Sequence, residues 1–354
     1  MAARQQIVII GGGYAGCLAA NRLTRKAPQA AITLVNPRPM FVERVRLHQL
    51  LAGTGAPETP LTAMVPDSVD VAVASATAIE DGRVRLDDGR TVDFDHLIYA
   101  DGGAAQAPEG ALAVGAVDQA RTARRRLAGL GAGATVMVVG GGATGIETAA
   151  EIAAARPDLT VVLRSDGEVG ATLSARARRR IDRELGRLGV RIERGRYDGP
   201  DTADGADLVL WAIATEVSDL ARRSGLAVDQ AGRLQVGADL VSVTDPRILG
   251  AGDGAAVPGQ RLSCQTALPQ GAHAADNLAR RLAGAAPAPY SMGYTAQNHS
   301  LGRRSGVIQL TRRDDTARRV WFGRRSAAVV KEQVCRAAKT AASTGRYVWL
   351  PGPR

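Results

Sequence analysis

The chain is poor in several residue types, and each shortage excludes a class of protein. Only 3% of its 354 residues are aromatic, and its three cysteines, Cys17, Cys264 and Cys335, lie far apart. An odd and sparse set of cysteines argues against a disulfide framework and fits a reducing cytoplasm. No apolar run approaches the roughly 18 residues of a membrane-spanning helix. The sequence therefore predicts a cytoplasmic protein without a membrane span.

Closely spaced cysteines and metal-ligand patterns are also missing. No Cys-x-x-Cys or Cys-x₄-Cys pair occurs, so a disulfide relay is disfavoured. The four histidines and three cysteines show no spacing typical of a metal site. We therefore expect no metal site.

Basic charge is concentrated at one end of the chain. Residues 301–354 hold 13 Lys/Arg and 3 Asp/Glu, whereas residues 1–300 hold 32 of each sign, so the C-terminal segment carries the whole net charge of +10. Its paired arginines could contact anionic lipid at the inner face of a membrane, or bind nucleic acid nonspecifically. A solvated surface in an arginine-rich chain is the third interpretation. We expect no specific nucleic-acid partner.

A glycine-rich turn follows the first apolar segment. Residues 6–10 predict a buried strand, residues 11–16 read Gly-Gly-Gly-Tyr-Ala-Gly, and residues 17–23 have helical spacing. In a G-x-G-x-x-G turn, Gly11 permits the tight bend, Gly13 lets the backbone approach a pyrophosphate, and Gly16 lets the helix pack on the strand. The next strand, 31–35, leads to Asn36 in place of the usual acid, and an amide can still hydrogen-bond a ribose.

The same pattern recurs in the middle of the chain. Strand 135–139 precedes Gly-Gly-Gly-Ala-Thr-Gly at 140–145, a helix at 146–155 and a strand at 159–163. Two such units in one chain predict two bound dinucleotides. Arg164 occupies the position at which an acid would select against a 2′-phosphate, so the sequence slightly favours NADPH over NADH.

The order of these motifs resembles a known family. The two glycine turns, the apolar strand ending in Gly252-Asp253, and the segments 94–102 and 265–278 together resemble the pyridine-nucleotide flavoproteins with two dinucleotide-binding domains. Within them the chain is most similar to single-subunit NADH:quinone dehydrogenases and apoptosis-inducing-factor-like oxidoreductases. Two positions depart from the family pattern, because Asp101 replaces Thr and Ala214 replaces Gly.

The resemblance implies an α/β fold with two Rossmann-like domains and a small α+β C-terminal domain. The FAD-binding domain would comprise residues 1–110 and 246–290, the NAD(P)-binding domain 111–245, and the C-terminal domain 291–354. The implied activity is FAD-dependent transfer of a hydride from NAD(P)H to FAD and on to an external acceptor, such as a quinone or a small organic molecule.

The resemblance also assigns candidate site residues. Asp253 would hydrogen-bond the ribityl chain of FAD, and the helix after residue 264 would direct its positive end at the flavin. Catalytic candidates are Glu147 and His48. Candidate cofactor contacts are Gly11, Gly13, Tyr14, Ala15, Gly16, Asn36, Arg44, Asp101, Gly102, Gly252, Asp253, Gln265, Thr266 and Ala267 for FAD, and Gly140, Gly142, Thr144, Gly145 and Arg164 for NAD(P)H.

Two rival functions stay open at this point. The first is a biosynthetic flavin-dependent oxidase or dehydrogenase that acts directly on a secondary-metabolite substrate and has a degenerate nicotinamide site. The second is a flavoprotein that binds or senses a partner through its basic C-terminal segment. The sequence does not choose the acceptor, the oligomeric state (a homodimer is one option) or the pathway, because fold-level analogy does not select a substrate.

Overall fold

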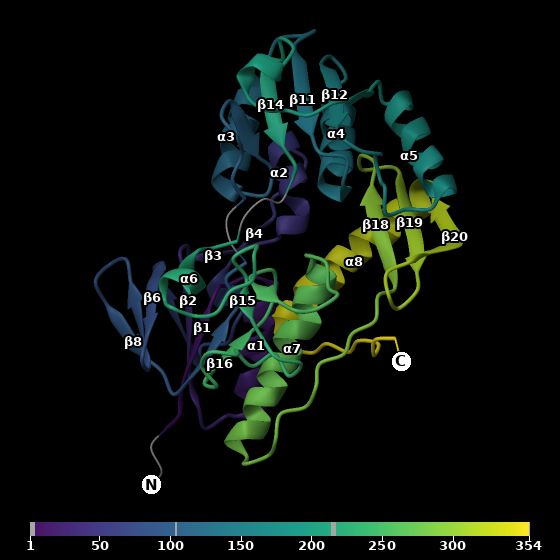
Figure 1. Cartoon of the computed structure of the whole chain (residues 1–354). Coiled ribbons are helices and arrows are strands. Elements are labelled where there is room, and N and C mark those ends of the chain that lie inside the picture. The colour runs from purple at the N-terminus through teal and green to yellow at the C-terminus, as the bar shows by residue number, and fades with distance from the viewer. Residues whose placement is uncertain (1–3, 103–104, 214–216, 354) are drawn as a thin grey trace.

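A computed structural model describes residues 4–102, 105–213 and 217–353. Figure 1 shows two lobes joined by a C-terminal unit, with the N-terminal lobe below and the teal lobe above. Ala214 lies outside the described residues. No helix within the described ranges is long and apolar enough to cross a membrane.

The first lobe is built on a parallel sheet of five strands in the order β16-β9-β1-β2-β5. Apolar runs buried on both faces are typical of such sheets, and four of the five residues of β1 are buried. β16 lies far along the chain from the other four strands, so the sheet is completed only by a segment late in the sequence. The strands are β1 (Gln6–Ile10), β2 (Ala31–Asn36), β5 (Val69–Val73), β9 (His96–Tyr99) and β16 (Ile248–Gly250).

The second lobe repeats this plan with the strand order β10-β14-β11-β12-β13, again entirely parallel. The strands are β10 (Ala111–Ala113), β11 (Thr135–Val139), β12 (Thr160–Ser165), β13 (Arg191–Arg194) and β14 (Leu208–Trp211). Its helices are α3 (Val117–Gly129), α4 (Ala143–Ala155) and α5 (Ala175–Arg187).

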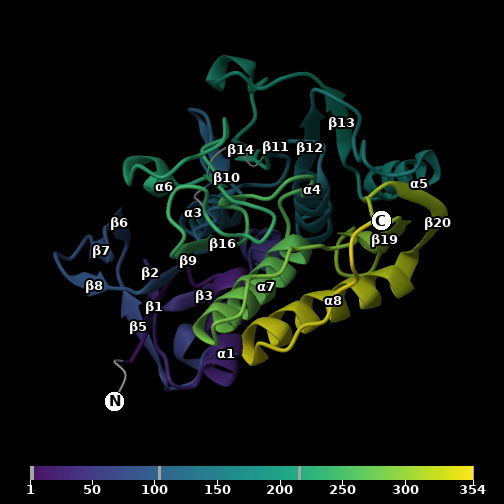
Figure 2. The same ribbon diagram turned by 60° about the horizontal axis from the view of Figure 1, so that its bottom comes forward.

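Two helices meet closely beneath the first sheet. In α1 (Tyr14–Lys26) and α7 (Cys264–Leu282) the backbones approach so near that a Cβ on Gly271 would lie 2.4 Å from the Ala15 carbonyl oxygen. Since no larger residue fits at this crossing, α7 is held with its N-terminus beside the first glycine turn. Figure 2 shows α8 (Arg324–Thr344) running next to both helices.

The C-terminal unit is an antiparallel sheet of three strands with α8 against it. Its strands are β18 (Ala296–Ser300), β19 (Gly306–Thr311) and β20 (Ala317–Gly323). The small α+β C-terminal domain implied by the resemblance matches these elements, whereas no strand was predicted at β18. α5 of the second lobe packs on β19 and β20, and α8 returns to α1 of the first lobe (Figure 1).

Short elements complete the chain. They are β3 (Met40–Val42), η1 (Arg44–Arg46), α2 (Leu47–Ala52), β4 (Glu58–Pro60), η2 (Leu61–Ala63), β6 (Ala76–Glu80), β7 (Arg83–Leu86), β8 (Thr91–Asp93), η3 (Pro200–Thr202), α6 (Leu220–Arg223), β15 (Leu234–Gln235) and β17 (Ala255–Ala256). The predicted α/β class with two Rossmann-like units is confirmed. The domain boundaries stay predictions.

Candidate active site

One large cavity, the main pocket, runs from the first glycine turn to the C-terminal unit. Its volume is about 2370 Å³, whereas a pocket for one drug-sized ligand has roughly 300–1,000 Å³. Its wall includes the first glycine turn, the start of α4, the start of α7, and residues of β18, β19, β20 and α8. The cavity can therefore hold more than one ligand.

The first glycine turn has the geometry that a phosphate cradle requires. Gly11 has a φ of +105°, and a Cβ on Gly16 would lie 1.9 Å from the Gly11 carbonyl oxygen, so neither position accepts a side chain. By contrast, a Cβ on Gly13 would meet no atom within 4 Å. Tyr14 and Ala15, which begin α1, line the main pocket. The open backbone at Gly13 and the helix start fit the pyrophosphate of a dinucleotide.

The second glycine turn repeats this geometry. Gly140 has a φ of +125°, and a Cβ on Gly145 would lie 1.7 Å from the Gly140 carbonyl oxygen. A Cβ on Gly142 would again meet nothing within 4 Å. Thr144 lines the main pocket, while the three glycines lie just outside its lining. The turn therefore fits a second dinucleotide at the same cavity.

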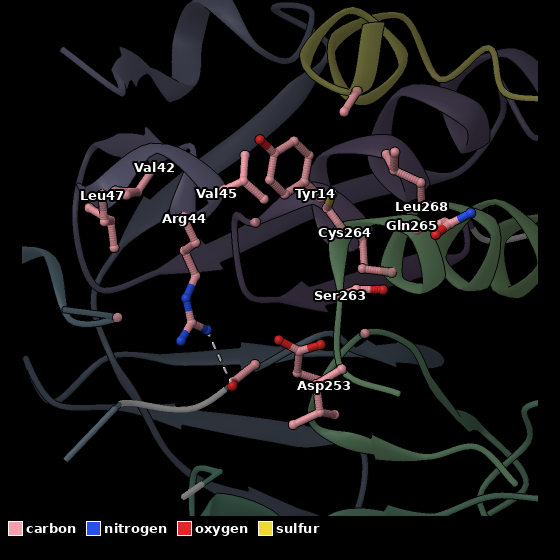
Figure 3. Close-up of a pocket in the computed structure, with 18 of the residues that line it drawn as sticks. Tyr14, Val42, Arg44, Val45, Leu47, Asp253, Ser263, Cys264, Gln265 and Leu268 are labelled. Carbon is pink, nitrogen blue, oxygen red and sulfur yellow. Dashed lines mark hydrogen bonds between the residues drawn. The ribbon is translucent and has the colours of Figure 1, made fainter. Parts of the chain in front are cut away.

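Asp253 carries an unsatisfied carboxylate oxygen at the pocket wall. Its Oδ1 is buried without a hydrogen-bond partner among the described residues. Burial raises the pKa of Asp253, and the nearby Arg44 guanidinium partly offsets this. Figure 3 shows both side chains directed into the same space, where Arg44 also donates to the Gly102 carbonyl. A sugar hydroxyl would satisfy the buried oxygen, so this residue fits the ribityl chain of FAD.

The neighbours of Asp253 shape the same wall. Asp101, Gly102 and Gly252 line the main pocket, and Gly252 has a φ of +79°. The Gly252 N–H donates to Gln270 Oε1 at 2.7 Å, which fixes the backbone immediately before Asp253. These residues lie where the sequence predicted them, and their role as cofactor contacts stays a prediction.

The start of α7 faces the pocket with two of its three predicted contact residues. Gln265 and Ala267 line the pocket, and the Ser263 hydroxyl caps the helix by accepting from the Thr266 N–H. Thr266 does not line the pocket, because its hydroxyl lies within hydrogen-bond distance of the Ser263 and Arg261 carbonyls. The Thr266 side chain therefore stabilises the helix start, and its role as a cofactor contact stays a prediction.

Asn36 lines the pocket and also holds the first glycine turn. Its Oδ1 accepts from the Gly12 N–H at 2.8 Å, and its Nδ2 donates to the Arg38 carbonyl at 2.6 Å. Both ends of the amide are thus engaged with the backbone. Asn36 lines the pocket, but its main role in this structure is to hold the glycine turn.

The predicted 2′-phosphate ligand Arg164 requires a correction of register. The Gly11 N–H donates to the Val35 carbonyl, and the Gly140 N–H donates to the Arg164 carbonyl, both at 2.8 Å. Arg164 is therefore equivalent to Val35, and the residue equivalent to Asn36 is Ser165.

The Arg164 side chain is buried and already paired. It donates to Glu193 at 3.0 Å and to the Thr202 carbonyl at 2.6 Å, and it forms a further ion pair with Asp204. Because two carboxylates surround it, it is not poised to take a 2′-phosphate. The NADPH preference is not supported.

The two catalytic candidates belong to one buried polar cluster, which we define as His48, Glu147, Ser300 and Lys331. Glu147 Oε1 accepts from the Ser300 N–H at 2.8 Å and from Ser300 Oγ at 3.0 Å. Lys331 Nζ lies 3.1 Å from the same oxygen, and His48 Nε2 lies 3.5 Å from Ser300 Oγ. Residues from α2, α4, β18 and α8 thus meet at one point.

Burial and charge fix the protonation of the polar cluster. Burial alone would raise the pKa of Glu147, but Lys331 and the nearby histidines hold it well below its usual range. Burial lowers the pKa of His48 to about 4 and that of the adjacent His299 also to about 4. Near neutral pH the cluster therefore contains a carboxylate–ammonium pair beside two neutral imidazoles.

Several residues of this site were not predicted from the sequence. Ser300 and His299 lie on the unpredicted strand β18, and both ring nitrogens of His299 are buried without a hydrogen-bond partner among the described residues. Lys331 was placed in a helix but given no role. Cys264 and Cys335 line the main pocket together although they are distant in sequence. Only the three-dimensional fold brings these residues together.

The fold and the site are those of an α/β oxidoreductase that can hold two dinucleotides. A model of the pyridine nucleotide-disulphide oxidoreductase family matches residues 5–276, and the chain belongs to that family. It is an FAD-dependent NAD(P)H oxidoreductase.

Individual relatives agree with this placement. The chain is 31% identical over 320 residues to an NADH dehydrogenase-like protein of Mycobacterium tuberculosis, covering 77% of this chain and 80% of the relative. It is 27% identical over 345 residues to a type II NADH:quinone oxidoreductase of that organism, covering 80% and 74%. The sulfide:quinone oxidoreductase structure of Aquifex aeolicus superposes with a TM-score of 0.81 at 15% identity, covering 97% and 92%, and shows a shared fold.

Proposed function

We propose that this enzyme oxidises NADH and reduces a small quinone-type acceptor bound at the C-terminal end of the main pocket. This proposal rests on the apolar surface at that end of the pocket. β19, β20 and α8 contribute to it the side chains of Ile308, Leu310, Phe322, Val330 and Val334. Phe322, Val330 and Val334 are more than one-third exposed although they are large and apolar. An apolar wall next to a few buried polar groups is typical of a small-molecule site.

The residues around the first glycine turn would hold FAD, which supplies the two-electron chemistry when bound. Gly13 and the start of α1 would receive the pyrophosphate, and Asp253 would accept a hydrogen bond from the ribityl chain. The N-terminus of α7 would place its partial positive charge beside the flavin ring. Arg44 would add a positive charge on the Asp253 side.

NADH is the favoured nucleotide in this proposal. Ser165 stands at the end of β12 where the ribose hydroxyls would lie, and Glu193 and Asp204 neutralise Arg164. A 2′-phosphate beside Arg164 would then meet a guanidinium that two carboxylates already neutralise. Similarity to the NADH dehydrogenase-like protein of Mycobacterium tuberculosis supports the same choice.

A dithiol relay is disfavoured even though two cysteines share the pocket. Burial raises the pKa of the Cys264 thiol to about 11, and it also raises the pKa of Cys335. Because the thiolate is the reactive form, both side chains are poor nucleophiles near neutral pH. Electrons would therefore pass directly to a bound acceptor.

Steady-state assays test this proposal. The FAD-loaded protein is mixed with NADH or NADPH and with a water-soluble quinone such as duroquinone, and kcat/KM is measured for each pair. We expect NADH to be preferred by at least roughly tenfold and the quinone to be reduced. Absence of quinone reduction with either nucleotide would contradict the proposed function, and direct oxidation of another substrate would then become the better explanation.

A further inference from the structure

The polar cluster lies between two cavities. Besides the main pocket, the structure has a second cavity of about 560 Å³, the side pocket, whose wall includes Gln49, Ser300, Arg303, Arg304, Lys331 and Glu332. Glu147 and His48 line the main pocket, Ser300 lines the side pocket, and Lys331 lines both. The cluster therefore connects two separate openings.

Hydrogen bonds run through the cluster without a gap. The Ser300 hydroxyl donates to Glu147 Oε1 at 3.0 Å, and Lys331 Nζ lies 3.1 Å from that same oxygen. A carboxylate can only accept, so the single Ser300 proton is committed to Glu147. His48 Nε2, 3.5 Å from Ser300 Oγ, must then be the donor in that weaker contact and orients the hydroxyl.

The proposed reaction consumes a proton. Its balance is NADH + H⁺ + quinone → NAD⁺ + hydroquinone, so two electrons and one proton come from NADH as a hydride equivalent. The other proton must come from the protein or from water. The acceptor end of the main pocket has apolar side chains in its wall, and the charged residues that line the pocket include Lys331 and Glu147, whose side chains are largely buried. This requirement rests on the proposed function.

We propose that the side pocket is the proton entrance for acceptor reduction, and that Ser300 passes protons from it to the Glu147–Lys331 pair. In the first step an N–H bond of Lys331 breaks and an O–H bond of the reduced acceptor forms, which leaves a neutral amine. Ser300 Oγ then takes a proton from water in the side pocket at the same time as its own proton moves to Glu147 and on to Lys331. No serine alkoxide forms, and the net transfer is one proton from solvent.

Electrostatics favour the return of the proton to this pair. Among the groups that lower the pKa of Glu147, Lys331 has the largest effect, and Glu147 in turn raises the pKa of Lys331 against the effect of burial. When Lys331 loses its proton, Glu147 loses its main counter-charge and becomes a better base. The remaining titratable groups that face it are the neutral His48 and His299, and Glu151, whose pKa is raised by burial.

Two substitutions at one position test the proposal. Ser300→Ala removes the hydroxyl, whereas Ser300→Thr keeps it. Turnover is measured with duroquinone, in H₂O and in D₂O, and with ferricyanide, whose reduction by NADH releases a proton instead of consuming one. We expect Ser300→Ala to lower quinone turnover roughly ten- to a hundredfold and to enlarge the solvent isotope effect. Ferricyanide reduction should stay within about twofold, and Ser300→Thr should restore quinone turnover.

The possible outcomes separate the two claims. Unchanged quinone turnover in Ser300→Ala would overturn the Ser300 route and leave the proposed function intact. An equal loss with both acceptors would also overturn it, since a merely structural role predicts that result. If the unmodified enzyme fails to reduce the quinone at all, the proposed function itself has failed.

Discussion

At the scale of single residues, Asp253 gives the sharpest prediction. Its buried oxygen has no partner among the described residues, so a hydrogen bond from a ligand hydroxyl would offset the cost of burying this oxygen. Asp253→Ala should weaken FAD binding roughly ten- to a hundredfold, because the loss of one hydrogen bond to a charged group changes a dissociation constant by about this factor. The FAD dissociation constant can be measured by titrating the apoprotein and following flavin fluorescence.

The stability of the apoprotein provides the control for this variant. Asp253→Ala removes a buried carboxylate oxygen that lacks a partner, together with the backbone hydrogen bond that the carboxylate accepts from Ser263, so the free energy of unfolding without FAD should change little. Asp67→Asn, which changes an exposed residue away from the pocket, should affect neither quantity. An Asp253→Ala protein with normal FAD affinity would remove this residue from the cofactor site.

The second glycine turn offers a matched pair of substitutions. A Cβ on Gly142 meets no atom within 4 Å, whereas a Cβ on Gly145 would lie 1.7 Å from a carbonyl oxygen. Gly142→Ala should fold normally and raise the KM for NADH roughly tenfold, because the methyl group occupies the space of the pyrophosphate. Gly145→Ala should instead destabilise the protein by about 1–3 kcal/mol.

Thermal unfolding and NADH kinetics together check this pair. The prediction is wrong if Gly142→Ala binds NADH normally, since the open backbone would then not be a phosphate site. Loss of stability in Gly142→Ala would show that the extended backbone at this position cannot accept a side chain.

Residue roles that depend on local pattern could be predicted from the sequence, and those that depend on register could not. The glycines and Asp253 follow from strand–turn order, and they lie as expected. The position at the end of β12 was assigned to Arg164 and belongs to Ser165, because the pairing of β12 with β11, and not composition, fixes where this strand ends. Thr266 and Asn36 were assigned to ligands but bond to the neighbouring backbone, a competition that pattern alone does not reveal.

At the scale of elements, α8 is anchored to the first lobe by ion pairs. Glu332 on α8 accepts from Arg46 Nη1 and Nη2 at 2.9 and 3.0 Å, and Lys339 lies 3.3 Å from Glu43. Glu332→Gln should lower the free energy of unfolding by about 1–3 kcal/mol, because it leaves Arg46 without its bidentate partner. Urea denaturation measures the change, and the exposed Glu109→Gln serves as the control.

The same ion pair predicts a pH dependence. The hydrogen bond from Arg46 lowers the pKa of Glu332 to about 2, below the roughly 4.3 of an unfolded glutamate. Because the pKa of Glu332 is lower in the folded protein than in the unfolded chain, the ion pair stabilises the fold at pH values above the unfolded-state pKa. This stabilisation is lost as the pH falls from about 5 towards 2. Glu332→Gln should therefore flatten this part of the stability curve. An unchanged acid profile would contradict the assigned role.

β18 shows why one element escaped prediction. Its sequence, Ala-Gln-Asn-His-Ser, is mostly polar and lacks the apolar alternation that predicts a strand. The strand is buried because it lies between β19 and the second lobe, so its polar side chains face α4 and α8 instead of solvent. The polar cluster owes Ser300 to this placement.

At the scale of the whole molecule, the fold could be predicted because its main unit occurs twice. Two strand–turn–helix–strand units set two parallel sheets, and the late strand β16 closes the first. The site between them could be predicted only in part. His48 and Glu147 were proposed separately, but their meeting with Ser300 and Lys331 depends on contacts between segments more than 90 residues apart.

Anaerobic stopped-flow mixing of the FAD-loaded protein with NADH tests the central claim most directly. The account predicts that NADH bleaches the flavin absorbance within the time of a catalytic turnover, and that NADPH does so at least roughly tenfold more slowly, because Arg164 is already paired with two carboxylates. Flavin that stays oxidised with both nucleotides, or a protein that takes up no FAD, would contradict it.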